Sequence, residues 1–222
     1  MTPAASSIVD WAAIDTVLVD MDGTLLDLNF DTFFWRELVP QRYAVRNGLT
    51  VLEARAKLEP RFDAKMGTLE WYCLDHWARD LELDLKTLKR EHRERIRFLP
   101  GAQEFLASVR ARDKRLSIVT NAHRDTFAVK AEHTGLDRLV DSVVCSHDFA
   151  APKESAAFWQ ALEAHEPFDR RRTLLIEDSL SVLAAARDYG IRHMLAIRRP
   201  DSQMPPRSTP DFLAVDGVFE LV

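Results

Sequence analysis

Cysteine is scarce in this chain of 222 residues: only Cys73 and Cys145 occur, far apart and without the spacing of metal ligands. This usage is typical of a reducing compartment and not of a disulfide-stapled scaffold. No apolar run approaches the roughly 20 residues that a membrane span needs. The stretch from Met1 to Trp11 lacks the basic and apolar regions of a secretory signal. We therefore expect a cytoplasmic protein that does not bind a membrane.

Positive charge is also in deficit. The chain has 30 lysines and arginines against 35 aspartates and glutamates, which gives a net charge of −5. A nucleic-acid polymer is therefore not an expected partner. The hydrophobic fraction of 46% and the charged fraction of 29% are ordinary for a globular protein, and nothing in the sequence indicates an obligate protein partner.

The most informative stretch is residues 17–26, with the sequence Val-Leu-Val-Asp-Met-Asp-Gly-Thr-Leu-Leu. It starts as an apolar, β-branched strand and ends in two carboxylates, Asp20 and Asp22. Side chains two apart in an extended chain point the same way, so these acids can share one face. Gly23 then permits a turn, and Thr24 places a hydroxyl just beyond it. Buried acids need a cation, and Mg²⁺ prefers oxygen ligands, although an idle acidic turn has the same spacing.

The middle of the chain, residues 27–98, has helical periodicity and no strand signal. Asp31 is a candidate N-cap, and Thr50 predicts a capping box with the glutamate three residues later. Thr68 opens another helix, and Asp84 starts a fourth one that is rich in charge. This block is therefore expected to be an all-helical insertion.

From residue 99 onward, strand and helix patterns alternate. The expected strands are 14–19, 115–120, 142–145, 173–177 and 193–197, and the expected helices are 102–112, 124–133, 154–165 and 181–189. This alternation predicts a parallel sheet with right-handed crossovers and helices on both faces. The proline-rich stretch 198–211 is expected to be an irregular loop.

The predicted fold class is α/β, with a doubly wound, mostly parallel sheet and an inserted all-helical cap domain. Segments 1–26 and 99–222 would form the core, and segment 27–98 the cap. Ligands of such sheets bind at the carboxyl ends of the strands, so the cap would lie over the two acids.

Three further strands are expected to end in polar groups at the same edge. Thr120 and Asn121 can donate to phosphate oxygens, although capping of the next helix is the more common role for such residues. Lys153 lies near a helix start, where the dipole disfavours a cation, although a solvated lysine is the common case. Glu177 and Asp178 are adjacent acids that need a cation, although Asp178 could also cap a helix.

Asp-Met-Asp-Gly-Thr-Leu after an apolar strand resembles the first motif of the haloacid dehalogenase superfamily, whose members are mostly Mg²⁺-dependent phosphatases. The resemblance implies that Asp20 is the nucleophile and Asp22 the general acid/base. The family's second motif is a serine or threonine where this chain has Thr120. Its third is a basic residue that pairs with the nucleophile and the phosphoryl group, which matches Pro-Lys-Glu around Lys153.

The fourth family motif is an acidic pair that holds Mg²⁺. This chain has Glu-Asp where many relatives have Asp-Asp, so Glu177 would bind the ion directly or through water. The implied metal site is Asp20, Asp22, Glu177 and Asp178; the implied catalytic residues are Asp20, Asp22 and Lys153; and the implied phosphate-binding residues are Gly23, Thr24, Thr120, Asn121 and Lys153.

The helical block also resembles the cap of bacterial GMP/IMP nucleotidases within this superfamily. The residues that carry this likeness are Phe30-Asp31, Phe34-Trp35, Leu38-Val39-Pro40, Asn47-Gly48 and 71–75 in the cap, with 121–123 and 132–136 in the core. The resemblance implies a purine nucleoside monophosphate, IMP or GMP, as the substrate.

One helix after Thr68 is expected to place Tyr72 and Trp77 on a stripe within the cap's own core. Trp71 and Leu74 would then lie on the opposite side of that helix, where an aromatic ring can stack on a purine.

The predicted reaction is hydrolysis of a phosphomonoester through an aspartyl-phosphate on Asp20. The alternatives are a phosphatase or phosphomutase for a sugar phosphate or other small metabolite, a dehalogenase, and a non-catalytic binding protein. A dehalogenase would not need Asp22 or the acidic pair. A degenerate binding protein should have lost one of the motif residues, and all of them are present.

Overall fold

The computed structural model describes residues 8–222, so the first seven residues of the predicted core segment 1–26 lie outside the described part. Most of the stretch inspected for a secretory signal, 1–11, lies there too. Within the described residues, no helix is long and apolar enough to cross a membrane.

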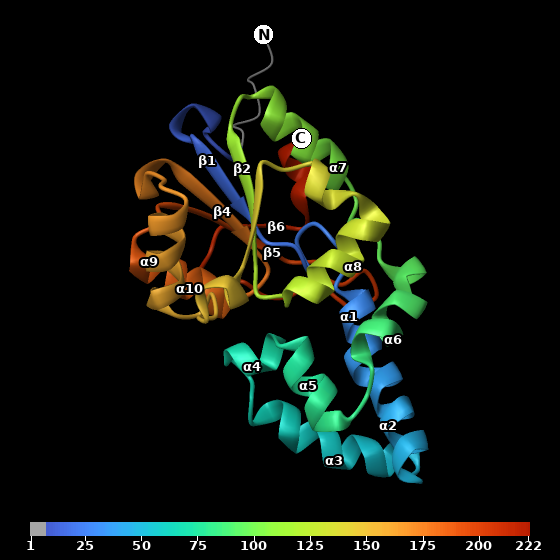
Figure 1. Cartoon of the computed structure of the whole chain (residues 1–222). Coiled ribbons are helices and arrows are strands. Elements are labelled where there is room, and N and C mark those ends of the chain that lie inside the picture. Colours follow the sequence, from blue (N-terminus) through green and yellow to red (C-terminus); the bar gives the residue numbers. More distant parts are fainter. Residues whose placement is uncertain (1–7) are drawn as a thin grey trace.

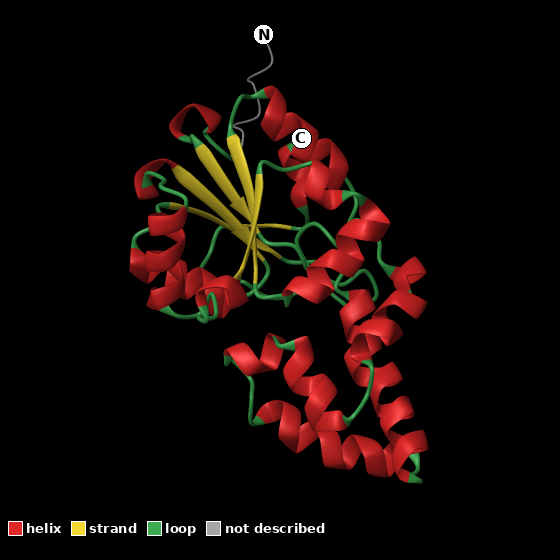
Figure 2. Cartoon of the chain, viewed as in Figure 1, coloured by secondary structure: helices red, strands yellow, loops and turns green. Residues whose placement is uncertain are grey.

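Six parallel strands form one sheet in the order β3-β2-β1-β4-β5-β6. Figure 2 shows the strands in yellow as a twisted sheet with helices on either side. The strands are β1 Thr16–Val19, β2 Arg115–Thr120, β3 Ser142–Cys145, β4 Thr173–Glu177, β5 His193–Ile197 and β6 Ala214–Val215. The predicted α/β class with a parallel sheet is confirmed. The sequence did not predict β6, whose two residues are too few to produce a strand pattern.

Helices flank the sheet and fill the segment after β1. They are α1 Asn29–Phe33, α2 Val39–Asn47, α3 Val51–Asp63, α4 Leu69–Tyr72, α5 Leu74–Leu81, α6 Leu85–Glu91, α7 Ala102–Ala111, α8 Arg124–Thr134, α9 Ala156–His165 and α10 Leu180–Tyr189. Figure 1 shows α7 and α8 on one side of the sheet and α9 and α10 on the other. The loop 198–211 has neither helix nor strand, as predicted.

β1 packs against both helix layers, because successive side chains in a strand point to opposite faces. Val17 and Val19 belong to a buried cluster with Phe105 of α7, whereas Leu18 belongs to a second cluster with Trp159 of α9. All four residues of β1 are buried. Since β1 pairs with β2 on one side and β4 on the other, the chain order reverses around it, and such a point is where α/β sheets bind ligands.

Between β1 and α7 the chain consists of helices and their connecting turns, with an antiparallel bridge from Leu26 to Phe98. That bridge brings the two ends of the helical segment together. Helices α2 to α5 stand away from the sheet (Figure 1), whereas α6 packs against α8. The predicted division into segments 1–26, 27–98 and 99–222 stays a prediction.

The helical segment has its own hydrophobic cluster. The rings of Phe62 and Trp77 pack edge to face with centroids 4.9 Å apart, and Trp71 packs edge to face on both. Leu74 is 2% exposed in the same cluster. The prediction that Trp71 and Leu74 lie on a side facing away from the cap core is therefore wrong. The cause is a break at Cys73, which separates α4 from α5.

Helix starts were predicted with mixed success. Thr50 forms the expected capping box, and Asp84 caps α6. Asp31 is not an N-cap, because α1 begins two residues earlier and Leu28 occupies the cap position. Its carboxylate instead accepts hydrogen bonds from the buried lysines Lys89 and Lys130.

Candidate active site

Asp20 lies directly after β1, at the carboxyl edge of the sheet, and is 5% exposed. Its N–H donates to the carbonyl of Ile176 on β4 at 2.9 Å, which holds the backbone as a continuation of the strand. Its carboxylate Oδ1 accepts a hydrogen bond from Lys153 Nζ at 2.5 Å. Both the main chain and the side chain of Asp20 are therefore fixed at this edge.

Lys153 is buried and has all three ammonium donors engaged. Besides Asp20, they reach Glu177 Oε2 at 2.6 Å and the carbonyl of Val119 at 2.9 Å. Burial opposes the charged form, but Asp20 and Glu177 outweigh it and raise the pKa of Lys153 above its ordinary value. The alternative of a solvated surface lysine is thereby excluded.

Three carboxylates meet at this point, since Asp20, Glu177 and Asp178 have oxygens within 4.8 Å of one another. Burial, reinforced by Glu177, raises the pKa of Asp20 to about 8. Burial, reinforced by the adjacent Asp178, raises the pKa of Glu177 to about 7. Burial, reinforced by Asp20, raises the pKa of Asp178 to about 7. The cluster is therefore short of positive charge.

A second cation reaches the cluster from the loop 198–211. Arg207 Nη1 donates to Asp178 Oδ2 at 2.9 Å, with about half of the arginine side chain exposed. Sequence reasoning missed this contact, because an arginine in a proline-rich loop has no periodicity that would indicate its direction. With Lys153, it makes two cations against three acids.

A hard divalent cation fits these residues. The donors are all carboxylate oxygens, which Mg²⁺ prefers, and the three acids exceed the two neighbouring cations by one charge. The hydroxyl of Thr24 is fully buried and has no hydrogen-bond partner among the described residues, so a polar group remains available beside the turn.

Gly23 allows the backbone of the turn to pass close to the cluster. Its φ of +90° is unfavourable for other residues, and a Cβ there would lie 2.8 Å from the Asp178 carboxylate and 2.9 Å from Pro200. Any side chain at this position would push Asp178 or the loop away.

The side chain of Asp22 is not part of the carboxylate cluster. Its Oδ1 accepts a hydrogen bond from Lys130 Nζ of α8 at 2.5 Å, and the same ammonium contacts Asp31. Asp31 in turn accepts a hydrogen bond from Lys89 of α6 at 2.8 Å. Sequence reasoning missed both lysines. A signal existed, because Lys130 follows Phe127 by three residues on the buried face of α8.

The end of β2 places Thr120 and Asn121 beside Lys153. Thr120 Oγ1 accepts from the N–H two residues later at 3.0 Å. Asn121 accepts from the N–H of Lys153 and donates to Glu154, both at 2.9 Å. His123 is the N-cap of α8, so neither Thr120 nor Asn121 caps that helix.

Tyr72 joins the cap helices to this edge, since its hydroxyl donates to Glu154 Oε1 at 2.6 Å. The prediction that Tyr72 lies within the cap's own core is therefore wrong. Burial and the nearby Glu154 raise the pKa of Tyr72, which keeps the phenol protonated and donating. Of the cap aromatics discussed above, Tyr72 is the one that reaches a residue adjacent to Lys153.

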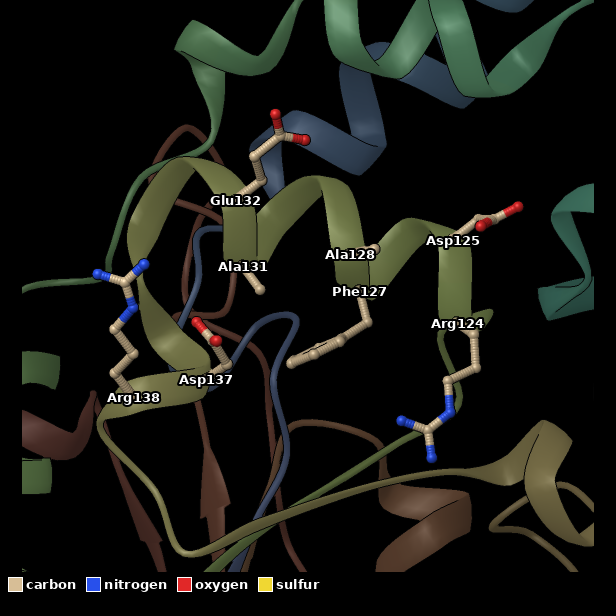
Figure 3. Close-up of a pocket in the computed structure, with 8 residues that line it drawn as sticks. All are labelled: Arg124, Asp125, Phe127, Ala128, Ala131, Glu132, Asp137 and Arg138. Carbon is tan, nitrogen blue, oxygen red and sulfur yellow. The ribbon is translucent and has the colours of Figure 1, made fainter.

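A surface hollow along α8 lies apart from the cluster (Figure 3). It is lined by Arg124, Asp125, Phe127, Ala128, Ala131, Glu132, Asp137 and Arg138. None of the carboxylates that meet at β1 borders it, so the hollow is not part of the candidate site.

Magnesium should stabilise this protein more at higher pH. Without metal, the three carboxyl groups have higher pKa values in the folded state than in the unfolded state. Between about pH 4 and pH 8 the folded state therefore binds more protons than the unfolded state. The contribution of this cluster to the free energy of unfolding falls as pH rises through that range. Metal binding needs the ionised carboxylates. The gain in Tm on adding Mg²⁺ is therefore expected to grow from about pH 5.5 to about pH 8.

Thermal melts with and without Mg²⁺ across that pH range measure this gain. The control is Asp178→Asn, which removes one charge and should reduce the gain at every pH. A gain that stays the same from the lower to the higher pH would contradict the assignment of these carboxylates as the metal site.

Comparison with known proteins identifies the family. Residues 17–196 match the profile of the haloacid dehalogenase-like hydrolases. The GMP/IMP nucleotidase YrfG of Escherichia coli is 41% identical over 194 residues, which cover 87% of this chain and 87% of that protein.

Solved structures share the fold at lower identity. A HAD phosphatase from Thermococcus onnurineus has a TM-score of 0.78 at 21% identity, covering 94% of this chain and 96% of that one. The L-2-haloacid dehalogenase PA0810 has a TM-score of 0.64 at 19% identity, covering 94% and 97%. Since a phosphatase and a dehalogenase are both similar at this level, these likenesses concern the fold alone. The family match, in contrast, spans the chain from β1 to β5. Because of this match and the 41% identity to the nucleotidase, the chain belongs to the haloacid dehalogenase-like hydrolases and is an enzyme of that class.

Proposed function

We propose that the protein is a Mg²⁺-dependent phosphomonoester hydrolase that forms an aspartyl-phosphate and acts on the purine nucleotides GMP and IMP. The observation that carries the chemistry is the contact of Asp20 with buried Lys153 inside a cluster of three carboxylates. The proposed substrate is supported by the 41% identity to a GMP/IMP nucleotidase.

The metal would be held by Asp20, Asp178 and the backbone carbonyl of Asp22, with Glu177 binding directly or through water. When bound, Mg²⁺ supplies positive charge that offsets the phosphoryl oxygens and keeps the neighbouring carboxylates ionised.

In the first step, a carboxylate oxygen of Asp20 forms a bond to phosphorus while the bond from phosphorus to the ester oxygen breaks. Asp22 gives its proton to the departing oxygen, so the nucleoside leaves as a neutral alcohol. Burial raises the pKa of Asp22 despite the ammonium of Lys130, which favours the protonated form that this step needs.

In the second step, a water molecule attacks the phosphorus of the aspartyl-phosphate. Asp22, now ionised, takes the proton of that water, and the bond from phosphorus to Asp20 breaks to release inorganic phosphate. Both aspartates are then in the states in which they began.

The remaining polar groups would hold the phosphoryl oxygens. The hydroxyl of Thr120 would donate to the transferring group, and Lys153 would offset its charge from its place beside Asp20. The unpartnered hydroxyl of Thr24 supports a phosphate position at the turn, where Gly23 lets the backbone approach closely. Asn121 uses both amide atoms on Lys153 and Glu154, so we propose that it orients the lysine.

Substrate preference is the direct test of this function. We expect kcat/KM for IMP and GMP to exceed the values for AMP, UMP and a sugar phosphate by at least about tenfold, because a site that hydrogen-bonds a 6-oxo purine leaves its polar groups unpaired with other substrates. Phosphate release under one set of conditions measures all five.

Two outcomes of this assay would contradict the proposal in different ways. A sugar phosphate that exceeds IMP and GMP by about tenfold would overturn the nucleotidase assignment and leave the phosphatase. Conversion of a sugar phosphate into an isomer without phosphate release would indicate a phosphomutase instead.

We also propose that the enzyme works in the cytoplasm on a small phosphorylated substrate. Both cysteines are free thiols, which agrees with a reducing compartment.

A further inference from the structure

A chain of charged side chains, with two buried lysines and two partly buried aspartates, connects Asp22 with the cap helices. It consists of Asp22, Lys130, Asp31 and Lys89, which we call the hinge network. Lys130 contacts Asp22 at 2.5 Å and also contacts Asp31, and Lys89 contacts Asp31 at 2.8 Å. The four residues come from the turn after β1, from α8, from α1 and from α6.

Both lysines of the hinge network are 1% exposed, and their surroundings are aromatic. Lys89 Nζ lies 4.2 Å from the ring centroid of Phe34 and 5.0 Å from that of Phe30, and Lys130 Nζ lies 5.6 Å from Phe30. A charge in such a place is unfavourable unless it is paired, and here each lysine contacts an aspartate. The positions of these side chains are therefore tightly specified.

Asp22 depends on this arrangement. Among the described residues, Lys130 supplies the hydrogen bond that the Asp22 carboxylate accepts. Lys130 shares its ammonium with Asp31, whose other oxygen is held by Lys89. Lys89 belongs to α6 and Lys130 belongs to α8, and these two helices pack against each other. A shift of one helix relative to the other would change the contacts of Asp31. The negative charge that Asp31 places beside Lys130 would change with them.

We propose that Lys130 is the positioning residue of Asp22, and that Asp31 and Lys89 make this positioning depend on the place of the cap helices. The proposal rests on the proposed function, in which Asp22 is the acid/base. Lys130 acts through Asp22 and does not touch the reacting phosphate.

A double-mutant cycle tests the first half of the proposal. Lys130→Met should lower kcat on IMP by about 10²-fold, the scale of a misplaced catalytic group, with KM changed by less than about threefold. In the Asp22→Asn background, Lys130→Met should change kcat by less than about threefold, because the group that it positions is already gone. Lys130→Arg keeps the charge and should recover part of the loss.

The choice of leaving group separates positioning from a general structural effect. 4-Nitrophenyl phosphate has a good leaving group that needs little protonation, so Lys130→Met should lower its burst of nitrophenol far less than the rate on IMP. Equal losses on both substrates, or equal losses with and without Asp22→Asn, would overturn the proposal. If the wild-type protein releases phosphate from neither substrate, the proposed function fails and this inference with it.

Lys89→Met tests the link to the cap and serves where Lys130→Met does not fold. This variant keeps the contact of Lys130 with Asp22. We expect Lys89→Met to lower kcat on IMP by about tenfold in the wild-type background and to have no such effect in the Asp22→Asn background. The matched control is Lys86→Met on the same helix. Lys86 also joins α6 to α8, through Asp125 at 2.7 Å, but this pair is partly exposed and does not reach Asp22. Equal effects of Lys89→Met and Lys86→Met would overturn the coupling.

Discussion

Replacing Asp20 with asparagine is expected to abolish phosphoenzyme formation and to lower kcat by at least about 10⁵-fold, on the scale seen when a covalent hydrolase loses its nucleophile. An amide oxygen is uncharged and does not attack phosphorus at a useful rate. Asparagine keeps the size of the side chain and an oxygen that can accept from Lys153, so the sheet edge should be preserved. Rapid quenching with a labelled phosphomonoester, followed by detection of labelled protein, measures the intermediate directly.

Asp22→Asn provides the contrast for this experiment. The nucleophile remains, so phosphoenzyme should still form, but the acid/base contribution of roughly 10²–10⁴-fold is lost. Substrates with poor leaving groups should suffer most, and an activated aryl phosphate should suffer less in the first step. If both variants lost the same factor on both kinds of substrate, the two aspartates would not have the separate roles proposed for them.

The parts of the site that belong to strand ends could be predicted from the sequence. Asp20, Thr120 and Glu177 each follow or end an apolar, β-branched run, and the carboxyl ends of parallel strands share one edge of the sheet. Local sequence patterns therefore predicted both the strands and the polar residues at their carboxyl ends. The helices of the core followed in the same way, although α9 begins at Ala156 and not at 154.

The contacts of the hinge network could not be predicted in this way, although the place of Lys130 on the apolar face of α8 indicated that this lysine is buried. Lys89 and Lys130 stand in helices where a lysine is ordinarily solvated, and their burial depends on acids far away in the chain. Lys130 and Asp22 are 108 residues apart in the sequence. The packing of α6 against α8 brings Lys89 and Lys130 to the same carboxylate, that of Asp31.

Periodicity also failed at the cap helix that was expected to continue past Tyr72. The apolar spacing continues without interruption through Cys73, but the thiol of that residue accepts from the N–H of His76 at 3.4 Å and caps a new helix. The break turns Tyr72 toward Glu154 and leaves Trp71 against Phe62. A cysteine N-cap is uncommon, so the pattern gave no sign of it.

Removal of divalent metal is expected to lower phosphate release by at least about 10³-fold, because a bound metal contributes several kcal/mol of charge stabilisation at a phosphoryl group. Without the ion, Asp20 and Asp178 are partly protonated near neutral pH, since burial raises their pKa values to about 8 and about 7, reinforced by Glu177 for Asp20 and by Asp20 for Asp178. A protonated Asp20 is not a nucleophile. Activity after treatment with EDTA, and again after addition of excess Mg²⁺, measures the effect.

Calcium is the informative control for this experiment. Ca²⁺ also prefers oxygen ligands, but it is larger and takes more of them at longer distances, so it should bind the carboxylates and support turnover poorly. The site offers little room for adjustment, because Gly23 already lies close to Asp178 and the ammonium of Lys153 holds both Asp20 and Glu177. Ca²⁺ is therefore expected to compete with Mg²⁺ and inhibit. Undiminished activity in EDTA would remove the metal from the mechanism and favour a dehalogenase-like reaction, in which Asp20 attacks carbon and no cation is needed.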